Sequence, residues 1–144
     1  MLDIVGYTAD KDLSKTSILE PSCGEGEFVI EIFRRLLESS RRFGFDSKTA
    51  FLSNVFAYDI DEAKITSCRG RIEELGLSLP LDGNIRQADF LTADIRCFDI
   101  VVGNPPYIRY EQIPADLLSS YKQQFHTFHY RADLYILFFE KTLK

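Results

Sequence analysis

The 144-residue sequence predicts an α/β fold, in which helices cover both faces of a doubly wound parallel sheet of about four strands. Short apolar runs alternate along the chain with segments of helical periodicity. Several of these runs end in glycine or in a polar residue, at the sheet edge where open α/β folds bind ligands. The composition, 45% hydrophobic and 27% charged residues, is that of an ordinary globular domain, and the length suffices for one core.

The first half of the chain contains two expected strands and two expected helices. Residues 17–20 form a short strand, followed by a turn over residues 21–26 and a helix with one broad apolar face. That face consists of Phe28, Val29, Ile32, Phe33, Leu36 and Leu37. We expect a polar connection over residues 39–50 and a second strand over residues 55–58, which ends at Asp59. The second helix is marked by Ile65, Cys68, Ile72 and Leu75, at spacings of three and four.

The second half contains two further strands, two further helices and a proline-rich segment. Residues 84–88 form a weaker strand, and residues 98–103 form the fourth. Residues 104–107, Asn-Pro-Pro-Tyr, then hold a carboxamide and an aromatic ring on a stiff backbone, because proline has no N–H to continue a ladder or a helix. We expect a short helix over residues 114–125 and a last helix over residues 131–144, in which Leu134, Leu137 and Phe138 face inward.

Three strand ends offer polar groups at one edge of the predicted sheet. Gly24 and Gly26 open a helix, so backbone N–H groups can approach the polar end of a ligand. The Asp59 carboxylate can accept both hydroxyls of a ribose, or it can cap the following helix, a task that Asp61 could perform equally well. Asp89 can accept an exocyclic amine beside the Phe90 ring, although a turn aspartate followed by a core phenylalanine explains both residues too.

Together these strand ends predict a pocket for an adenosine-containing cofactor, with Asn104 and Tyr107 beside it. A nicotinamide enzyme could use such a pocket, but its fingerprint is the longer Gly-x-Gly-x-x-Gly. Position 29 is valine here, which argues against hydride transfer.

Five motifs in order resemble those of S-adenosylmethionine-dependent DNA adenine-N6 methyltransferases, especially the methyltransferase portion of large type II restriction-modification enzymes. The domain of that family is Rossmann-like. The resemblance covers residues 17–144. Its motifs are residues 19–28 (Leu-Glu-Pro-Ser-Cys-Gly-Glu-Gly-Glu-Phe), 57–61 (Ala-Tyr-Asp-Ile-Asp), 88–91 (Ala-Asp-Phe-Leu), 104–110 (Asn-Pro-Pro-Tyr-Ile-Arg-Tyr), and 132–135 (Ala-Asp-Leu-Tyr) with 139–141 (Phe-Glu-Lys).

The resemblance implies the cofactor S-adenosylmethionine and a set of site residues. The implied cofactor-binding residues are Glu20, Pro21, Cys23, Gly24, Gly26, Asp59, Ile60, Asp89, Phe90 and Asn104, and the implied catalytic residues are Asn104, Pro105, Pro106 and Tyr107. The Asn104 side-chain oxygen and the Pro105 carbonyl would accept hydrogen bonds from the target amine, while Tyr107 would stack on a base turned out of the duplex. Asp133 and Tyr135 match the following helix of the family, and Tyr135 is equally well explained as a core residue.

The resemblance also implies that the sequence is the N-terminal part of a longer enzyme. The family has a cofactor-contacting segment before the first strand, several strands after the last helix and a separate DNA-recognition domain. We therefore expect an N-terminal extension over residues 1–16, part of a catalytic domain over residues 17–144, and a fourth strand at an exposed edge. The expected partners are DNA, through the absent C-terminal domain, and the remainder of the enzyme, so the chain alone should have little activity.

Composition excludes several other classes of function. The net charge of −5 disfavours tight DNA binding by this chain alone, and the cluster of Arg34, Arg35, Arg41 and Arg42 is explained by a helix C-terminus. Three cysteines, far apart, indicate neither a disulfide framework nor a zinc site, and His126 and His129 lack a third ligand, so no metal is predicted. Without a signal peptide or an apolar run of about 20 residues, we expect a cytoplasmic protein without a membrane segment.

Two alternative functions stay open. Protein glutamine N5-methyltransferases share Asn-Pro-Pro-Tyr, because an amide nitrogen is an equally poor nucleophile, but they lack the Glu-Pro-Ser-Cys-Gly start and the Asp-Leu-Tyr helix. The chain could also be a non-catalytic remnant that only folds or associates.

Overall fold

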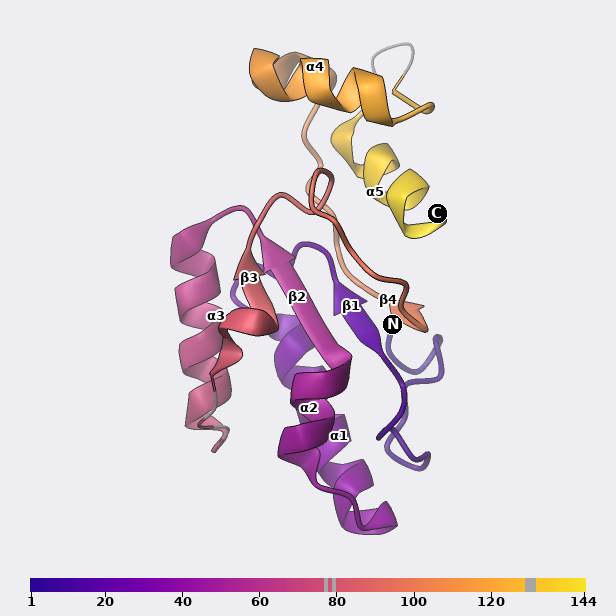
Figure 1. The fold of residues 1–144 in the computed structure, drawn as a ribbon, viewed down its shortest axis with the longest axis vertical. Helices are drawn as coiled ribbons and strands as arrows, with labels where there is room; N and C mark the ends of the chain where they lie inside the picture. The colour runs from indigo at the N-terminus through magenta and orange to yellow at the C-terminus, as the bar shows by residue number, and fades with distance from the viewer. Residues whose placement is uncertain (77, 79, 129–131) are drawn as a thin grey trace.

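The computed structural model describes residues 1–76, 78, 80–128 and 132–144, and it confirms the predicted α/β architecture (Figure 1). The four strands are β1 (Ile18–Glu20), β2 (Val55–Asp59), β3 (Ile85–Gln87) and β4 (Ile100–Val101). The helices are α1 (Glu27–Phe43), α2 (Ser47–Asn54), α3 (Glu62–Glu74), α4 (Ala115–Gln124) and α5 (Leu134–Thr142), with short 3₁₀ turns η1 (Leu81–Gly83) and η2 (Tyr110–Gln112).

The sheet is parallel throughout, in the order β3-β2-β1-β4. Strand β1 is central, and its Leu19 lies opposite Phe56 on one side and Val101 on the other. Strand β4 is at the edge, as predicted, but it has two residues where the sequence suggested six over residues 98–103. All four strands run in one direction, so their carboxyl ends meet at one edge of the sheet.

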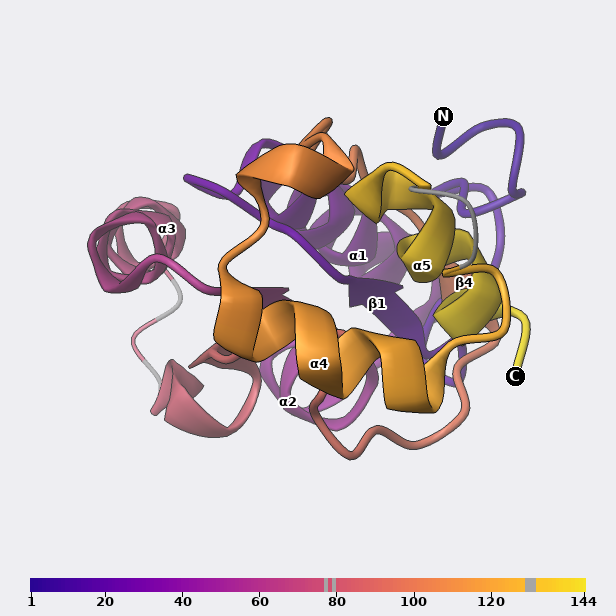
Figure 2. The same ribbon diagram turned by 90° about the horizontal axis from the view of Figure 1, so that it is seen from above.

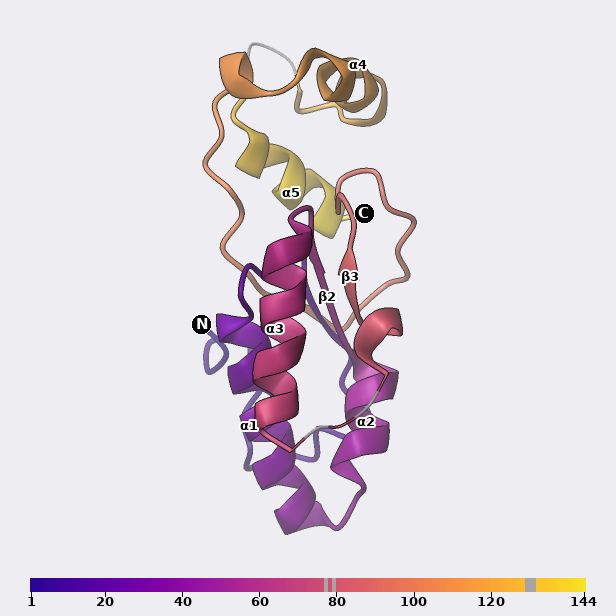
Figure 3. The same ribbon diagram turned by 90° about the vertical axis from the view of Figure 1, so that its left-hand side faces the viewer.

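Two hydrophobic cores lie on opposite faces of the sheet, because successive residues of a strand point to opposite faces. Ile18 belongs to the core against α1 and α3, which cover one face (Figure 3). Leu19, the next residue, belongs to the core that includes residues of α4 and α5. These two helices lie across the carboxyl end of the sheet when it is seen from above (Figure 2).

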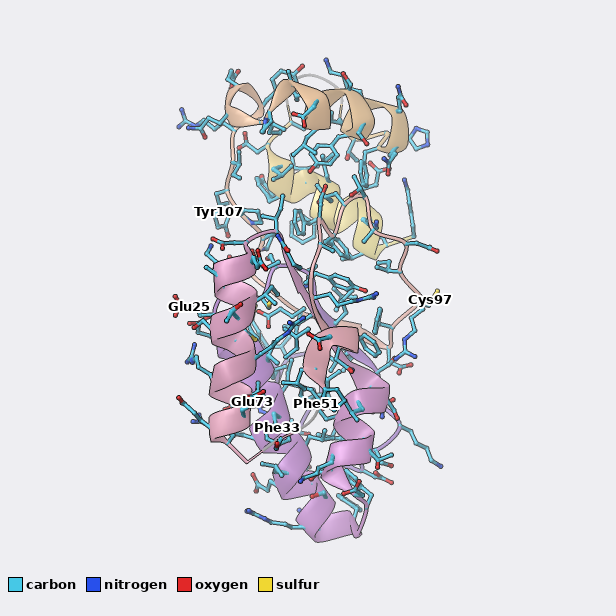
Figure 4. The ribbon with its side chains drawn as sticks, turned by 60° about the vertical axis from the view of Figure 1, so that its left-hand side comes forward. Glu25, Phe33, Phe51, Glu73, Cys97 and Tyr107 are labelled. Carbon is cyan, nitrogen blue, oxygen red and sulfur yellow. The ribbon has the colours of Figure 1, made fainter. Side chains whose placement is uncertain are left out.

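The polar connection expected over residues 39–50 is wrong, because α1 continues to Phe43 and α2 begins at Ser47. The Asp46 side chain caps α2 by accepting from the Thr49 N–H at 2.9 Å. Phe51 of α2 is fully buried and packs edge-on against Phe33 of α1, with ring centroids 5.4 Å apart (Figure 4). A helix of eight residues with two buried side chains has too little periodicity to be recognised in the sequence.

The first 16 residues pack onto the sheet and α1. Leu2, Tyr7 and Leu13 are buried in the core against α1. Arg35 of α1 holds the segment by an ion pair with Asp3 at 2.6 Å and by a hydrogen bond to the Tyr7 carbonyl at 2.9 Å.

The two last helices form as predicted, with a later start for the second. Helix α4 begins after Pro114, and α5 begins at Leu134, with Leu134, Leu137 and Phe138 buried; position 131 lies outside the described residues. Among the helices of the described residues, none combines the length and apolar character needed to cross a membrane.

Candidate functional site

A cavity of about 760 Å³ lies at the carboxyl ends of the strands, beside residues of α4 and α5. Its volume is in the range of small-molecule sites, roughly 300–1,000 Å³. Ten of the sequence-predicted site residues line it: Glu20, Pro21, Cys23, Gly24, Asp59, Ile60, Asp89, Phe90, Asn104 and Pro106. Gly26, Pro105 and Tyr107 do not line it.

The glycine turn after β1 packs closely on α3. Gly24 has a φ of 54°, and its N–H donates to Asp59 Oδ2 at 2.8 Å. Gly26 has a φ of 90°, and a Cβ there would lie 2.5 Å from the Cys68 sulfur. Gly26 therefore lets the turn approach α3, whereas Gly24 forms part of the cavity wall.

Asp59 and Asp61, which the sequence left as alternative caps of the following helix, have different roles at the end of β2. Asp61 caps α3, because its Oδ1 accepts from the Ala63 N–H at 2.9 Å. Asp59 Oδ1 accepts from the Asp61 N–H at 3.0 Å, while its Oδ2 binds Gly24. Asp59 thus ties the ends of β1 and β2 together, and its carboxylate faces the cavity.

Glu20, at the end of β1, is a buried carboxyl group in the cavity wall. Its side chain is 2% exposed, and Oε2 has no hydrogen-bond partner among the described residues. Burial raises the pKa of Glu20 to about 9, and the acidic groups Glu27 and Asp59 add to this effect. A buried carboxyl with an unsatisfied oxygen favours a ligand that brings a cation or a hydrogen-bond donor.

The end of β3 leads into a turn in which Asp89 and Phe90 have both structural and cavity-lining places. Asp89 Oδ1 accepts from the Leu91 N–H at 2.9 Å, and Oδ2 accepts from the Tyr121 hydroxyl of α4 at 2.9 Å. Phe90 is buried and stacks on Phe138 of α5, with ring centroids 5.2 Å apart. The turn explanation left open by the sequence is therefore compatible with a place in the cavity wall.

The Asn-Pro-Pro-Tyr segment leaves β4 close to the turn after β1. A Cβ on Gly103 would lie 3.2 Å from Pro21 Cδ, so a glycine permits this approach. The Ser22 hydroxyl donates to the Asn104 carbonyl at 3.1 Å, which fixes the start of the segment. These contacts place the Asn104 side chain in the cavity wall beside the strand ends.

Tyr107 lies at the surface, on the connection between the sheet and the last two helices (Figure 4). Its side chain is 74% exposed, and its ring lies against Tyr135 of α5 with centroids 5.8 Å apart. Its hydroxyl donates to Asn104 Oδ1 at 3.2 Å, so the aromatic ring and the carboxamide of the segment are linked.

The sequence did not identify the part of the cavity wall that comes from the last third of the chain. These missed residues are Ile108, Ile113, Pro114, Leu117, Tyr121, Leu134 and Phe138. Their helical spacing indicated only inward-facing apolar residues, and packing against the strand ends is a tertiary feature without a local signal. Helix α5 begins after Asp133, and Tyr135 of its first turn contacts Tyr107.

Metal binding finds no support in the described residues. No group of three His, Cys, Asp or Glu side chains that could hold an ion occurs among them. His129, one member of the histidine pair noted in the sequence, lies outside the described residues.

Comparison with known proteins gives one consistent group of relatives. A family model described as Eco57I restriction-modification methylase matches residues 81–144, which include β3, β4 and the Asn-Pro-Pro-Tyr segment. The type II methyltransferase M.XhoI of Xanthomonas vasicola is 41% identical over 99% of this chain, which covers 29% of that protein. M.PaeR7I of Pseudomonas aeruginosa is 37% identical over 99% of the chain, and M.BstVI of Geobacillus stearothermophilus is 34% identical over all of it. The chain spans 27% and 29% of these two relatives.

Proposed function

We propose that this chain, which is homologous over nearly its whole length to type II restriction-modification methyltransferases, supplies the cofactor pocket and the catalytic segment of a DNA adenine-N6 methyltransferase. The observation that carries the proposal is the single cavity that gathers the ends of β1, β2 and β3 with Asn104. Four acidic side chains (Glu20, Glu27, Asp59 and Asp89) and the Asn104 carboxamide, all of them able to accept hydrogen bonds, line this one space.

The cavity fits S-adenosylmethionine, which supplies an electrophilic methyl group on a sulfonium. Glu20, with its unsatisfied buried oxygen, would bind the ammonium group of the methionine part. Asp59 would accept the ribose hydroxyls, and Asp89 would accept the exocyclic amine of the adenine. Phe90 and Ile60, both in the cavity wall, would flank the adenine ring, and the turn from Pro21 to Gly26 would surround the methionine part.

The Asn-Pro-Pro-Tyr segment would make an adenine amine more nucleophilic. Such an amine is a weak nucleophile because its lone pair is delocalised into the ring. Asn104 Oδ1 and the Pro105 carbonyl would accept hydrogen bonds from the two N–H groups of this amine. They would thereby favour a pyramidal nitrogen with a free lone pair. Because charge develops on this nitrogen during the transfer, fixed acceptors stabilise the transition state more than the ground state. The methylated nitrogen, which is strongly acidic because of its positive charge, would release its extra proton to water, so no side chain with a lowered pKa is needed as a base.

Tyr107 is suited to hold the target base. A base that is methylated on its exocyclic amine must leave the duplex stack, and stacking on an aromatic side chain contributes about 1–3 kcal/mol. The exposed Tyr107 ring offers such a face. The Tyr107 hydroxyl donates to Asn104 Oδ1, so the residue that would stack on the base is bonded to the residue that would accept from the base's amine.

Titration calorimetry with S-adenosylmethionine tests the cofactor part of the proposal. The cavity forms within this chain, so the chain should bind the cofactor, and Asp59→Ala should weaken binding by tenfold or more because a pair of charge-assisted hydrogen bonds is lost, about 1.4 kcal/mol or more. Asp61→Ala is the matched control, since it removes the cap of α3 but no cavity-lining group. A folded chain that binds no cofactor would contradict the proposal.

Methyl transfer from tritiated cofactor tests the substrate. We expect the complete enzyme to label adenine in duplex oligonucleotides and not release-factor peptides, the substrate class of the glutamine N5-methyltransferases. The chain alone, with its net charge of −5, should bind DNA weakly and label little. Labelling of the peptides in place of the oligonucleotides would favour the glutamine alternative.

A further inference from the structure

Tyr121 of α4 is a buried tyrosine whose hydroxyl contacts the carboxylate at the end of β3. Its side chain is 2% exposed, and its ring packs edge-on against Phe125 and Phe128. The hydroxyl donates to Asp89 Oδ2 at 2.9 Å. Burial, followed by the bond to Asp89, raises the pKa of Tyr121, so the hydroxyl keeps its proton and remains a donor.

The contacts of Asp89 leave its carboxylate little freedom to turn. Oδ1 accepts from the Leu91 N–H at 2.9 Å, and Oδ2 accepts from Tyr121 and, at 3.2 Å, from the Thr92 hydroxyl. An ionised carboxylate has about four acceptor positions, so capacity remains for about one further donor. That donor can come from the cavity, because Asp89 lines it.

We propose that Tyr121 is a positioning residue that makes the pocket selective for a 6-aminopurine cofactor. This inference rests on the proposed function. Tyr121 holds Asp89 in one orientation as a pure acceptor, so a ligand must bring a donor to this point, as the amine of adenosine does. A 6-oxopurine would place its carbonyl oxygen against the carboxylate, and two buried acceptors facing each other are strongly disfavoured.

Removal of the Tyr121 hydroxyl separates this role from simple packing. Tyr121→Phe keeps the ring and its contacts with Phe125 and Phe128. Asp89 then loses one of its three donors, can turn in its pocket, and no longer faces the ligand in one orientation. Affinity for the adenosine ligand should fall, while affinity for an inosine ligand, which the fixed carboxylate repels, should stay the same or rise. A purely structural role would lower both affinities alike.

The experiment measures the binding of S-adenosylhomocysteine and S-inosylhomocysteine to the chain by calorimetry. We expect Tyr121→Phe to lower the affinity for the adenosyl ligand about tenfold, as for the loss of a hydrogen bond to a charged group, and to leave the affinity for the inosyl ligand unchanged or higher. Tyr110→Phe is the matched control, because the Tyr110 ring packs on the same Phe128 ring, 5.5 Å between centroids. It should leave the ratio of the two affinities unchanged.

A double-mutant cycle with Asp89→Asn locates the effect. If Tyr121 acts through Asp89, then Tyr121→Phe should not change the ratio of affinities in the Asp89→Asn background. An equal loss of affinity for both ligands, or an unchanged ratio in the single variant, would overturn the inference while leaving the proposed function intact. Failure of the unmodified chain to bind the adenosyl ligand would contradict the proposed function and this inference with it.

Discussion

Replacing Glu20 by glutamine should stabilise the domain at neutral pH and weaken its affinity for S-adenosylmethionine. The Glu20 side chain is 2% exposed, one of its oxygens has no partner among the described residues, and burial raises its pKa to about 9. Glutamine has nearly the same size and stays neutral. The substitution therefore removes the group that can ionise, and with it the negative charge that could form beside a cationic ligand group, and it largely keeps the packing.

The effect on stability depends on pH in a direction set by the raised pKa. Between the ordinary value of 4.5 and about 9, the folded state keeps a proton on Glu20 that the unfolded chain has released. The wild type therefore loses stability as the pH rises through this window, by about 1.4 kcal/mol per pH unit. At pH 7 this loss of stability amounts to roughly 3 kcal/mol, and the Glu20→Gln variant, whose side chain does not ionise, should not show it.

Urea denaturation at pH 5, 7 and 8.5, together with calorimetric titration of the cofactor, measures both effects. The stability advantage of Glu20→Gln should grow with each step in pH, while its affinity for the cofactor falls about tenfold or more. Glu38→Gln makes the same change at an exposed position of α1 and should stay within about 0.5 kcal/mol of the wild type throughout. A stability difference that does not vary with pH would refute the reasoning.

Three further substitutions test other contacts. Asn84→Ala removes a buried amide that caps the end of α2 by donating to two backbone carbonyls at 2.9 and 2.7 Å. It should lower the free energy of unfolding by about 2–4 kcal/mol in denaturation experiments, and a loss below about 1 kcal/mol would contradict the capping role. Gly26→Ala should cost about 1–3 kcal/mol, because its Cβ would meet the Cys68 sulfur, and Cys68→Ala should recover part of that loss if the clash is its cause. In the complete enzyme, Tyr107→Phe should retain methyl transfer within about tenfold, whereas Tyr107→Ala should lose more, since the ring provides the stacking; equal losses would assign the effect to the hydroxyl.

The sequence predicts the sheet well because its strands are short apolar runs that end in distinctive residues. Asp59 and Asp89 mark the ends of β2 and β3, and carboxyl ends of parallel strands share one edge. Helix α2 escapes prediction because its formation depends on tertiary contacts, the packing of Phe51 on Phe33 and the cap that Asn84 provides from a distant segment.

The candidate site likewise contains residues that can be predicted from the sequence and residues that cannot. The strand-end residues of the cavity can be found from motif and spacing, since each lies at a local break in the chain. Tyr121 cannot, because an aromatic residue at helical spacing looks the same whether it fills a core or contacts a carboxylate 32 positions earlier in the chain. The buried state of Glu20 likewise depends on a segment distant in sequence, since a Cβ on Gly103 would lie 3.7 Å from its Cγ.

The alternation of Ile18 and Leu19 between two cores makes β1 a partition between a supporting side and a ligand side. In the Ile18 core, Cys23 and the adjoining Phe28 also line the pocket, whereas most of the other residues on that side do not, so most substitutions there leave the pocket wall unchanged and the two sides can diverge at different rates during evolution. The strand itself is not free in this way. A single-residue insertion or deletion before it would exchange its two faces and place each side chain in the wrong core.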